Sequence, residues 1–153
     1  LVDPTLCVSC GICAASCAPM GVGPEGRTGR HQLAHVRSTL LPALASAGTP
    51  VRVVVAYCAQ TDATLAAQLS AEGAQLHAVP CIGTLHTSVI ELLLRQGASG
   101  VFVVGCPPRD CAAREGPKGT ELRMYHDREA ELQARVDRRR VRLATAPAGR
   151  SAD

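Results

Sequence analysis

The sequence predicts an α/β fold, in which a small parallel sheet is flanked by helices in a Rossmann-like layer. Three Val-rich apolar runs alternate with segments of helical periodicity, giving the order strand, helix, strand, helix, strand. The runs are nearly continuous in hydrophobicity, as expected for parallel strands that are covered on both faces. The units have nearly equal lengths, because the cysteines that follow the three runs lie 23 and 25 residues apart.

A cysteine-rich segment and a linker precede the predicted sheet. Residues 1–22 hold four cysteines, and residues 21–30 contain four glycines and one proline, which do not suit the interior of a helix or strand. We expect a separate unit at 1–22 and a linker with a helix at 23–49. The helix is predicted over 32–46, because apolar residues recur there at helical spacing: Leu33, Val36, Leu40, Leu41 and Leu44.

Residues 50–145 form the predicted α/β domain. Its parallel strands are expected at 51–57, 75–79 and 100–104. A helix over 62–72, with Asp62 or Thr61 as its N-terminal cap, and a Leu-rich helix over 86–96 connect these strands. A glycine follows each helix and favours its end there.

The C-terminal part of the sequence carries a weaker pattern. Residues 105–126 are predicted as a long loop. A charged helix is predicted over 127–139, because a weak apolar stripe includes Leu132. Alternating polar and apolar residues at 140–143 predict a short edge strand, and 146–153 are expected to be a disordered tail.

Composition excludes several classes of protein. With 46% apolar and 19% charged residues, the 153-residue chain is not a disordered one. Aromatic residues make up only 2%, so recognition of nucleic acid by base stacking is excluded, and a net charge of +3 is too small for a polyanion-binding protein. No apolar run reaches the roughly 18 residues that a membrane helix needs.

The cysteines also indicate the compartment. Four of the eight lie at short, fixed spacing, which is typical of metal ligands and points to a reducing environment. The first ten residues contain an acidic residue and cysteines, so they do not form a signal peptide. We therefore expect a cytoplasmic protein. The chain begins at Leu1 and not at Met, which is compatible with a piece of a longer polypeptide.

The first cysteine set has the spacing Cys-x-x-Cys-x-x-Cys-x-x-x-Cys, at Cys7, Cys10, Cys13 and Cys17. This run resembles a bacterial ferredoxin half-motif, which holds a [4Fe-4S] cluster. Gly11 lies inside the loop, where a positive φ is often needed. Zinc is the alternative, although zinc sites more often pair two separated Cys-x-x-Cys knuckles.

The fourth cysteine of this run has two possible roles. In two-cluster ferredoxins the fourth cysteine ligates the other cluster, and the chain contains no second run. Cys17 either closes its own cluster or belongs to a cluster whose other half-motif lies upstream of Leu1. On the second interpretation, a longer form of the protein should hold one more cubane.

The second cysteine set is Cys58, Cys81, Cys106 and Cys111. The first three each follow a predicted strand, and the carboxyl ends of parallel strands meet at one edge of a sheet. Cys111 follows in a loop that two prolines stiffen. Four thiolates at one edge can bind an iron–sulfur cluster or zinc, whereas the simplest alternative is four buried free cysteines.

Residues around this second set resemble the delta subunit of methyl-viologen-reducing hydrogenase, a family also called the hydrogenase iron–sulfur subunit. The similarity covers about residues 50–145 and rests on these motifs: Tyr57-Cys58, Pro80-Cys81-Ile82-Gly83, the Gly-Cys-x-Pro-x-Asp-Cys core that ends at Cys111, and Glu115-Gly116. The family often has a Cys-x-x-Cys pair after the first strand, whereas Thr61 stands at the second position here.

The resemblance implies both a cofactor and partners. It implies a small α/β domain that holds a [2Fe-2S] cluster on Cys58, Cys81, Cys106 and Cys111. Such a domain passes electrons between a hydrogenase or another donor and a heterodisulfide-reductase-like partner. Members are often fused to ferredoxin modules, or lie next to them. The expected partners are therefore redox proteins.

Several charged residues and histidines lie near the cysteines in the sequence. Arg109, Arg114 and Lys118 surround the last two cysteines, where cations would favour a reduced cluster and raise its potential, or would simply be surface charges. No histidine is expected to be a ligand, although His86 follows Cys81 most closely. The basic run is interpreted as a solvated face: Arg138, Arg139, Arg140 and Arg142.

The sequence therefore favours an electron-transfer subunit or domain over a catalyst, because no Ser-His-Asp set or carboxylate pair stands out. Two alternatives remain open. One is a zinc-stabilised interaction domain, which would be colourless. The other is a thiol–disulfide oxidoreductase, which would need an exposed, reactive pair such as Cys106 and Cys111.

Overall fold

Four parallel strands form the sheet, in the order β2-β1-β3-β4. The strands are β1 (Val53–Cys58), β2 (Gln75–Val79), β3 (Gly100–Gly105) and β4 (Val141–Thr145). The computed structural model describes residues 2–3, 5–46, 48, 51–126, 128–147 and 149. The predicted α/β class with a parallel sheet is confirmed, and β4 lies at the edge, as expected for the C-terminal strand.

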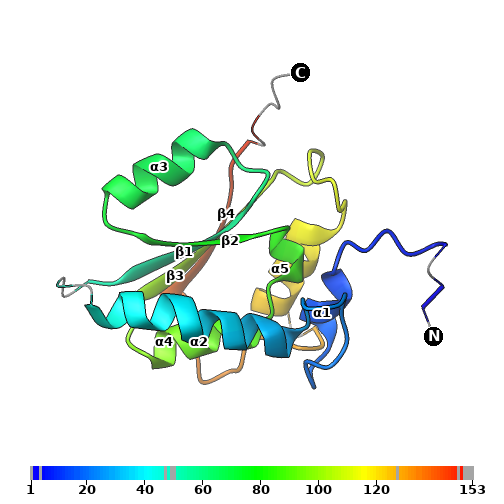
Figure 1. Cartoon of the computed structure of the whole chain (residues 1–153), viewed down its shortest axis with the longest axis horizontal. Coiled ribbons are helices and arrows are strands. Elements are labelled where there is room, and N and C mark those ends of the chain that lie inside the picture. Colours follow the sequence, from blue (N-terminus) through cyan, green and yellow to red (C-terminus); the bar gives the residue numbers. More distant parts are fainter. Residues whose placement is uncertain are drawn as a thin grey trace.

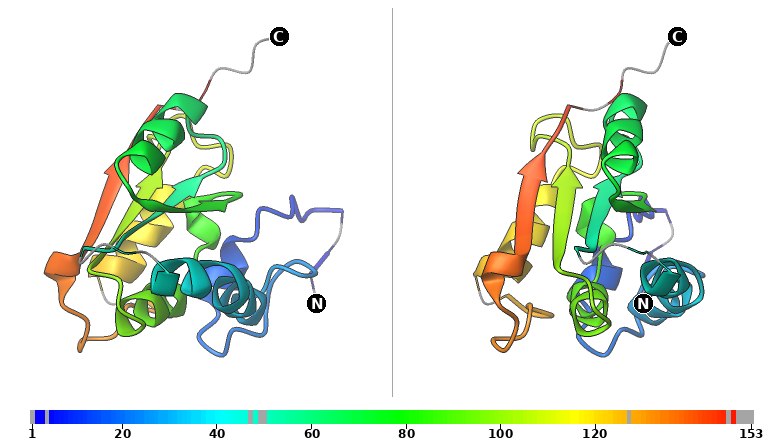
Figure 2. Two further views of the ribbon diagram at one scale, coloured as in Figure 1. Left: turned by 60° about the vertical axis from the view of Figure 1, so that its left-hand side comes forward. Right: turned by 90° about the vertical axis from the view of Figure 1, so that its left-hand side faces the viewer.

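Helices lie on both sides of this sheet. Helices α2 (Gly29–Ser46) and α4 (Thr87–Arg95) lie on one side, and α3 (Ala63–Ala71) lies on the other (Figure 1). Two views turned about the vertical axis show the strands running side by side between them (Figure 2). Asp62 caps α3, because its Oδ1 accepts a hydrogen bond from the Thr64 amide at 2.8 Å.

Alternate strand residues build the core against α2 and α4. Val54 and Ala56 of β1 are completely buried, as are Val101 and Val103 of β3. They belong to one cluster with the apolar stripe of α2, in which Val36 has no exposed surface. The stripe predicted for this helix is therefore its core-facing side. No helix in the described ranges is long and apolar enough to cross a membrane.

The loop predicted at 105–126 is only partly a loop, because α5 (Gly116–Tyr125) forms within it. The helix was not predicted because two glycines and a proline, which have weak helix propensity, lie near its start. Pro117 stands in the first turn, where a missing amide hydrogen costs nothing. Gly116 and Gly119 are buried, so packing outweighs the weak helix propensity of this segment.

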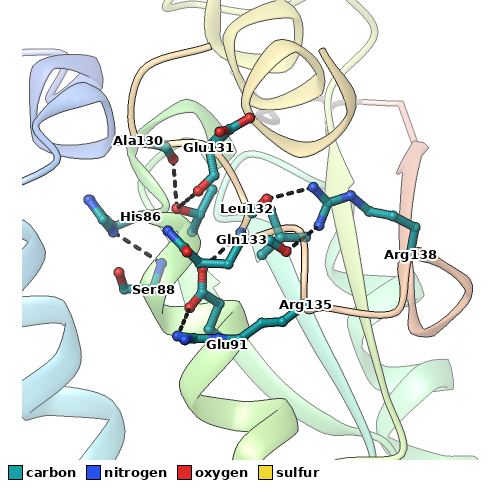
Figure 3. A network of polar contacts seen from close by, with 10 residues as sticks. His86, Ser88, Glu91, Ala130, Glu131, Leu132, Gln133, Arg135 and Arg138 are labelled. Atoms are coloured by element: carbon teal, nitrogen blue, oxygen red, sulfur yellow. Dashed lines mark hydrogen bonds and ion pairs between the residues drawn. The ribbon is translucent and has the colours of Figure 1, made fainter. Parts of the chain in front are cut away.

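The charged helix predicted over 127–139 is wrong. Within its described residues the chain forms turns and a short 3-10 helix, η2 (Arg138–Arg140). Backbone groups of this segment form hydrogen bonds with side chains of α4. Thr87 Oγ1 donates to the Ala130 carbonyl at 2.7 Å, and Glu91 accepts from the Gln133 amide at 3.1 Å (Figure 3). These contacts replace the internal hydrogen bonds of a helix.

Leu132 anchors this loop, because its side chain is completely buried in the core. Leu132→Ala should lower the free energy of unfolding of the metal-free protein by about 2–5 kcal/mol, since it leaves a cavity under the loop. Leu6→Ala is the matched control, because Leu6 is 80% exposed. Urea denaturation measures both variants. Equal stabilities for the two would contradict the anchoring role.

Part of the expected disordered tail lies outside the described residues. Of 146–153, the structure describes 146, 147 and 149. The Ala146 amide donates to the Gly105 carbonyl at 2.9 Å, and the Gly149 amide donates to the Gln60 carbonyl at 2.8 Å. The described part of this segment therefore contacts the carboxyl edge of the sheet.

Candidate metal centre

Cysteines from three strand ends meet at the carboxyl edge of the sheet. Cys58 is the last residue of β1, Cys81 precedes a short 3-10 helix, η1 (Ile82–Thr84), after β2, and Cys106 follows β3. The sulfurs of Cys58 and Cys106 are 3.6 Å apart. Together with Cys111, these cysteines line one cavity of about 270 Å³. The topology therefore brings together all four cysteines of the second set.

The backbone of α5 closes this cavity from one side. A Cβ atom on Gly116 would lie 2.4 Å from the sulfur of Cys81 and 3.3 Å from that of Cys111. The glycine is thus required by close approach of the two sulfurs, not by its backbone angles. A Cβ on Gly83 would in turn lie 2.5 Å from the Gly116 Cα, so α5 begins directly against η1.

The sulfurs influence one another electrostatically. Hydrogen bonding to the Cys81 thiol lowers the pKa of Cys58 to about 5, whereas the same pairing, with burial, raises the pKa of Cys81. Burial raises the pKa of Cys106 to about 11, and the charge of Cys58 adds to this. Cys58 therefore loses its proton readily, whereas ionisation of Cys81 and Cys106 is unfavourable. A fully ionised set needs a cation among the four sulfurs.

By residue type, the four cysteines suit a thiolate-ligated metal centre, although as placed among the described residues they do not already surround a single ion. All four side chains are soft sulfur ligands, which suit iron–sulfur clusters and zinc. Two thiolates on one tetrahedral ion, at a metal–sulfur distance of about 2.3 Å, would be roughly 3.8 Å apart, close to the separation of Cys58 and Cys106. The Gly83 amide already donates to the Cys81 sulfur at 3.4 Å.

The first cysteine set is arranged more openly. Cys7 and Cys13 are exposed, and Cys10 and Cys17 are half-buried. Gly11 has a φ of +79° and precedes α1 (Ile12–Ser16), so the expected positive φ is confirmed. Across the described ranges, no three or more His, Cys, Asp or Glu side chains are disposed to hold a single metal ion.

The segment that carries the first set docks onto the second site. Cys10 lines the same cavity as the four cysteines of the sheet edge, and α1 lies against η1. His86 Nε2 is 3.1 Å from the Cys17 carbonyl, and its Nδ1 accepts from the Ser88 amide at 3.1 Å. Nε2 therefore carries the hydrogen and donates it to the Cys17 carbonyl, so both ring nitrogens form hydrogen bonds. Gln32 adds a bridge, because it contacts both the Thr84 carbonyl and the His86 amide.

A family comparison matches the part of the chain that forms the sheet. The family model for the delta subunit of methyl-viologen-reducing hydrogenase matches residues 52–153. The chain belongs to this family. The matched region contains all four cysteines of the sheet edge, and the first cysteine set lies outside it. A search of curated proteins finds no match.

The cations expected near the delta-subunit cysteines lie at the surface. Arg109 and Arg114 are exposed, and Lys118 is paired with Glu115 at 3.3 Å. The buried cation is instead Arg123 of α5, with 1% of its surface exposed. Nothing in the sequence distinguishes Arg123, because it falls in a predicted loop among ordinary surface charges.

Gly116→Ala should damage the delta-subunit site selectively. The added methyl group would occupy the space of the Cys81 sulfur, so we expect the iron content of the sheet-edge site to fall by more than half. Gly48→Ala is the matched control for cofactor content, because a methyl group there meets nothing within 4 Å and Gly48 has no positive φ. Iron analysis after anaerobic reconstitution compares the two. Full iron loading of Gly116→Ala would refute the close packing described above.

Proposed function

We propose that this chain is an electron-transfer subunit or domain. On this proposal, Cys58, Cys81, Cys106 and Cys111 hold a [2Fe-2S] cluster. The observation that carries the proposal is the convergence of these four thiols, from three strand ends and one loop, on one cavity. Membership of the delta-subunit family supports it, because the family points to a hydrogenase or heterodisulfide-reductase type of complex.

The first cysteine set adds a second centre to the proposal. Cys7, Cys10 and Cys13 would hold a [4Fe-4S] cluster, with Cys17 either as its fourth ligand or as a ligand of a cluster outside this chain. Because Cys10 borders the cavity of the second set, the two centres would be neighbours. Electrons would pass between them and on to a redox partner, such as a hydrogenase or a heterodisulfide-reductase-like subunit.

The protein itself would supply the environment of these clusters. A bound cluster supplies one-electron exchange. Cys58 and Cys106, each 3% exposed, hold their sulfurs away from water. The Gly83 amide donates to the Cys81 sulfur, which stabilises negative charge there. The His86 contact with the Cys17 carbonyl holds the first segment beside the loop that follows Cys81.

Zinc is the second candidate, because the Cys58–Cys106 sulfur separation also suits one tetrahedral ion. The thiol–disulfide alternative is not supported by burial. It required an exposed pair, whereas Cys106 is 3% and Cys111 is 8% exposed.

Electron uptake distinguishes the proposal from the zinc alternative. The reconstituted protein is titrated anaerobically with dithionite while its visible absorption is recorded. We expect a brown protein that takes up about two electrons per chain, one for each cluster. A colourless protein that binds zinc and takes up no electrons would overturn the proposed function.

A further inference from the structure

Arg123 lies between the two cysteine sets. Its Nη2 donates to the Gly83 carbonyl at 2.9 Å, and its Nη1 donates to Ser16 Oγ at 3.4 Å. Gly83 follows Cys81 by two residues, and Ser16 directly precedes Cys17. The guanidinium group therefore bridges two short segments, each of which carries a cysteine of a different set.

The charge of Arg123 is buried without a compensating anion among the described residues. Its side chain is 1% exposed, and no described carboxylate forms an ion pair with it. Its hydrogen-bond acceptors are neutral: two hydroxyl groups, of Ser16 and Thr120, and one carbonyl. Its Nε has no hydrogen-bond partner. A buried guanidinium is costly unless negative charge lies nearby.

Cys81 is the anionic group that acts on the charge of Arg123. Burial lowers the pKa of Arg123 to about 10, and the Cys81 thiolate acts in the opposite direction. Arg123 therefore remains a cation at neutral pH. Thiolate-bound clusters are anionic and become more so on reduction. A fixed cation beside them favours the reduced state and raises the reduction potential.

We propose that Arg123 is a shared counter-cation for the two cysteine centres, and that it raises the reduction potential of both. This inference rests on the proposed function, because it requires both centres to hold clusters. Reduction adds one electron, from the redox partner, to a cluster and breaks no bond. Arg123 thus acts as a tuning residue that touches the segments holding the clusters, and it takes part in no chemical step.

Removal of the charge provides the first test. The full chain is reconstituted anaerobically, and reduced and oxidised clusters are counted by EPR at fixed ambient potentials. In Arg123→Gln, the ratio of reduced to oxidised cluster at each centre should fall about tenfold, equivalent to 59 mV for a one-electron couple. Lys118→Gln is the control, because Lys118 is exposed on the same helix, and it should change the ratio by less than about twofold.

Neutralisation of the charge in place provides the second test, in case Arg123→Gln fails to fold or to take up iron. Ser16→Asp places a carboxylate next to the guanidinium, so it should lower both ratios in the same direction, whereas Ser16→Asn should not. A wild-type protein without iron overturns the proposed function itself. Loaded proteins whose potentials do not respond to these substitutions, or respond at only one centre, overturn the shared role of Arg123.

Discussion

Cys81→Ser should remove the cluster of the sheet edge and leave the N-terminal centre in place. The Cys81 sulfur interacts with the Cys58 thiol, accepts a hydrogen bond from the Gly83 amide and packs against Gly116. A hydroxyl group is a poor ligand for an iron–sulfur cluster. We expect iron to fall from about six to about four atoms per chain.

Cys13→Ser is the reciprocal control for this experiment. Cys13 is exposed on α1 and belongs to the first set, so its loss should remove the N-terminal cluster and leave about two iron atoms at the sheet edge. Iron and acid-labile sulfide are measured on both variants. If Cys81→Ser kept the full wild-type iron and sulfide content, the four-cysteine site would be refuted.

The affinity of the sheet edge for metal should depend strongly on pH. The raised pKa values keep the thiols of Cys81 and Cys106 protonated at neutral pH. A bound metal needs thiolates, so binding must release these protons. With at least these two protons released, the apparent affinity should rise by at least about a hundredfold for each pH unit between pH 6 and 8, and it should fall by the same factor on acidification.

Co²⁺ is a suitable probe for this measurement. It is titrated anaerobically into a variant in which the four N-terminal cysteines are replaced by serine, in competition with a chelator of known affinity. Further substitution of Cys106 by serine should reduce this pH dependence by about tenfold per pH unit, because one raised thiol is lost. An affinity that did not depend on pH in the first variant would show that the thiols are already ionised.

The sequence was sufficient for the parts of the fold that follow regular patterns. The continuous apolar strands and their equal spacing predicted the parallel sheet, and from it the meeting of Cys58, Cys81 and Cys106 at one edge. Asp62 as a helix cap and Gly11 with a positive φ were predicted from local chemistry alone. Such features depend on neighbours in sequence or on the topology of the sheet.

Features decided by tertiary packing could not be predicted in this way. Helix α5 contains two glycines, and it is stable because those glycines allow it to approach Cys81 and η1. The segment around Leu132 has the composition of a charged helix, but its polar groups find partners on α4. Arg123 could not be distinguished from a surface arginine, because its burial depends on both of these arrangements.

The docking of the N-terminal segment was also beyond sequence analysis. The junction depends on the His86 contact with the Cys17 carbonyl, and Gln32 of α2 supports His86 by bonding backbone groups 52 and 54 residues away. No spacing rule connects such residues. As a result, Cys10 of the first set lines the same cavity as the four cysteines of the sheet edge.

On the proposed function, the four cysteines of the sheet edge hold an iron–sulfur cluster. Low-temperature EPR of the anaerobically reduced wild-type protein, with iron counted per chain, tests it most directly. We expect two distinct reduced-cluster signals and about six iron atoms, of which the [2Fe-2S] signal disappears in Cys81→Ser. A single signal that persists in Cys81→Ser, with about four iron atoms per chain in both proteins, would contradict the claim.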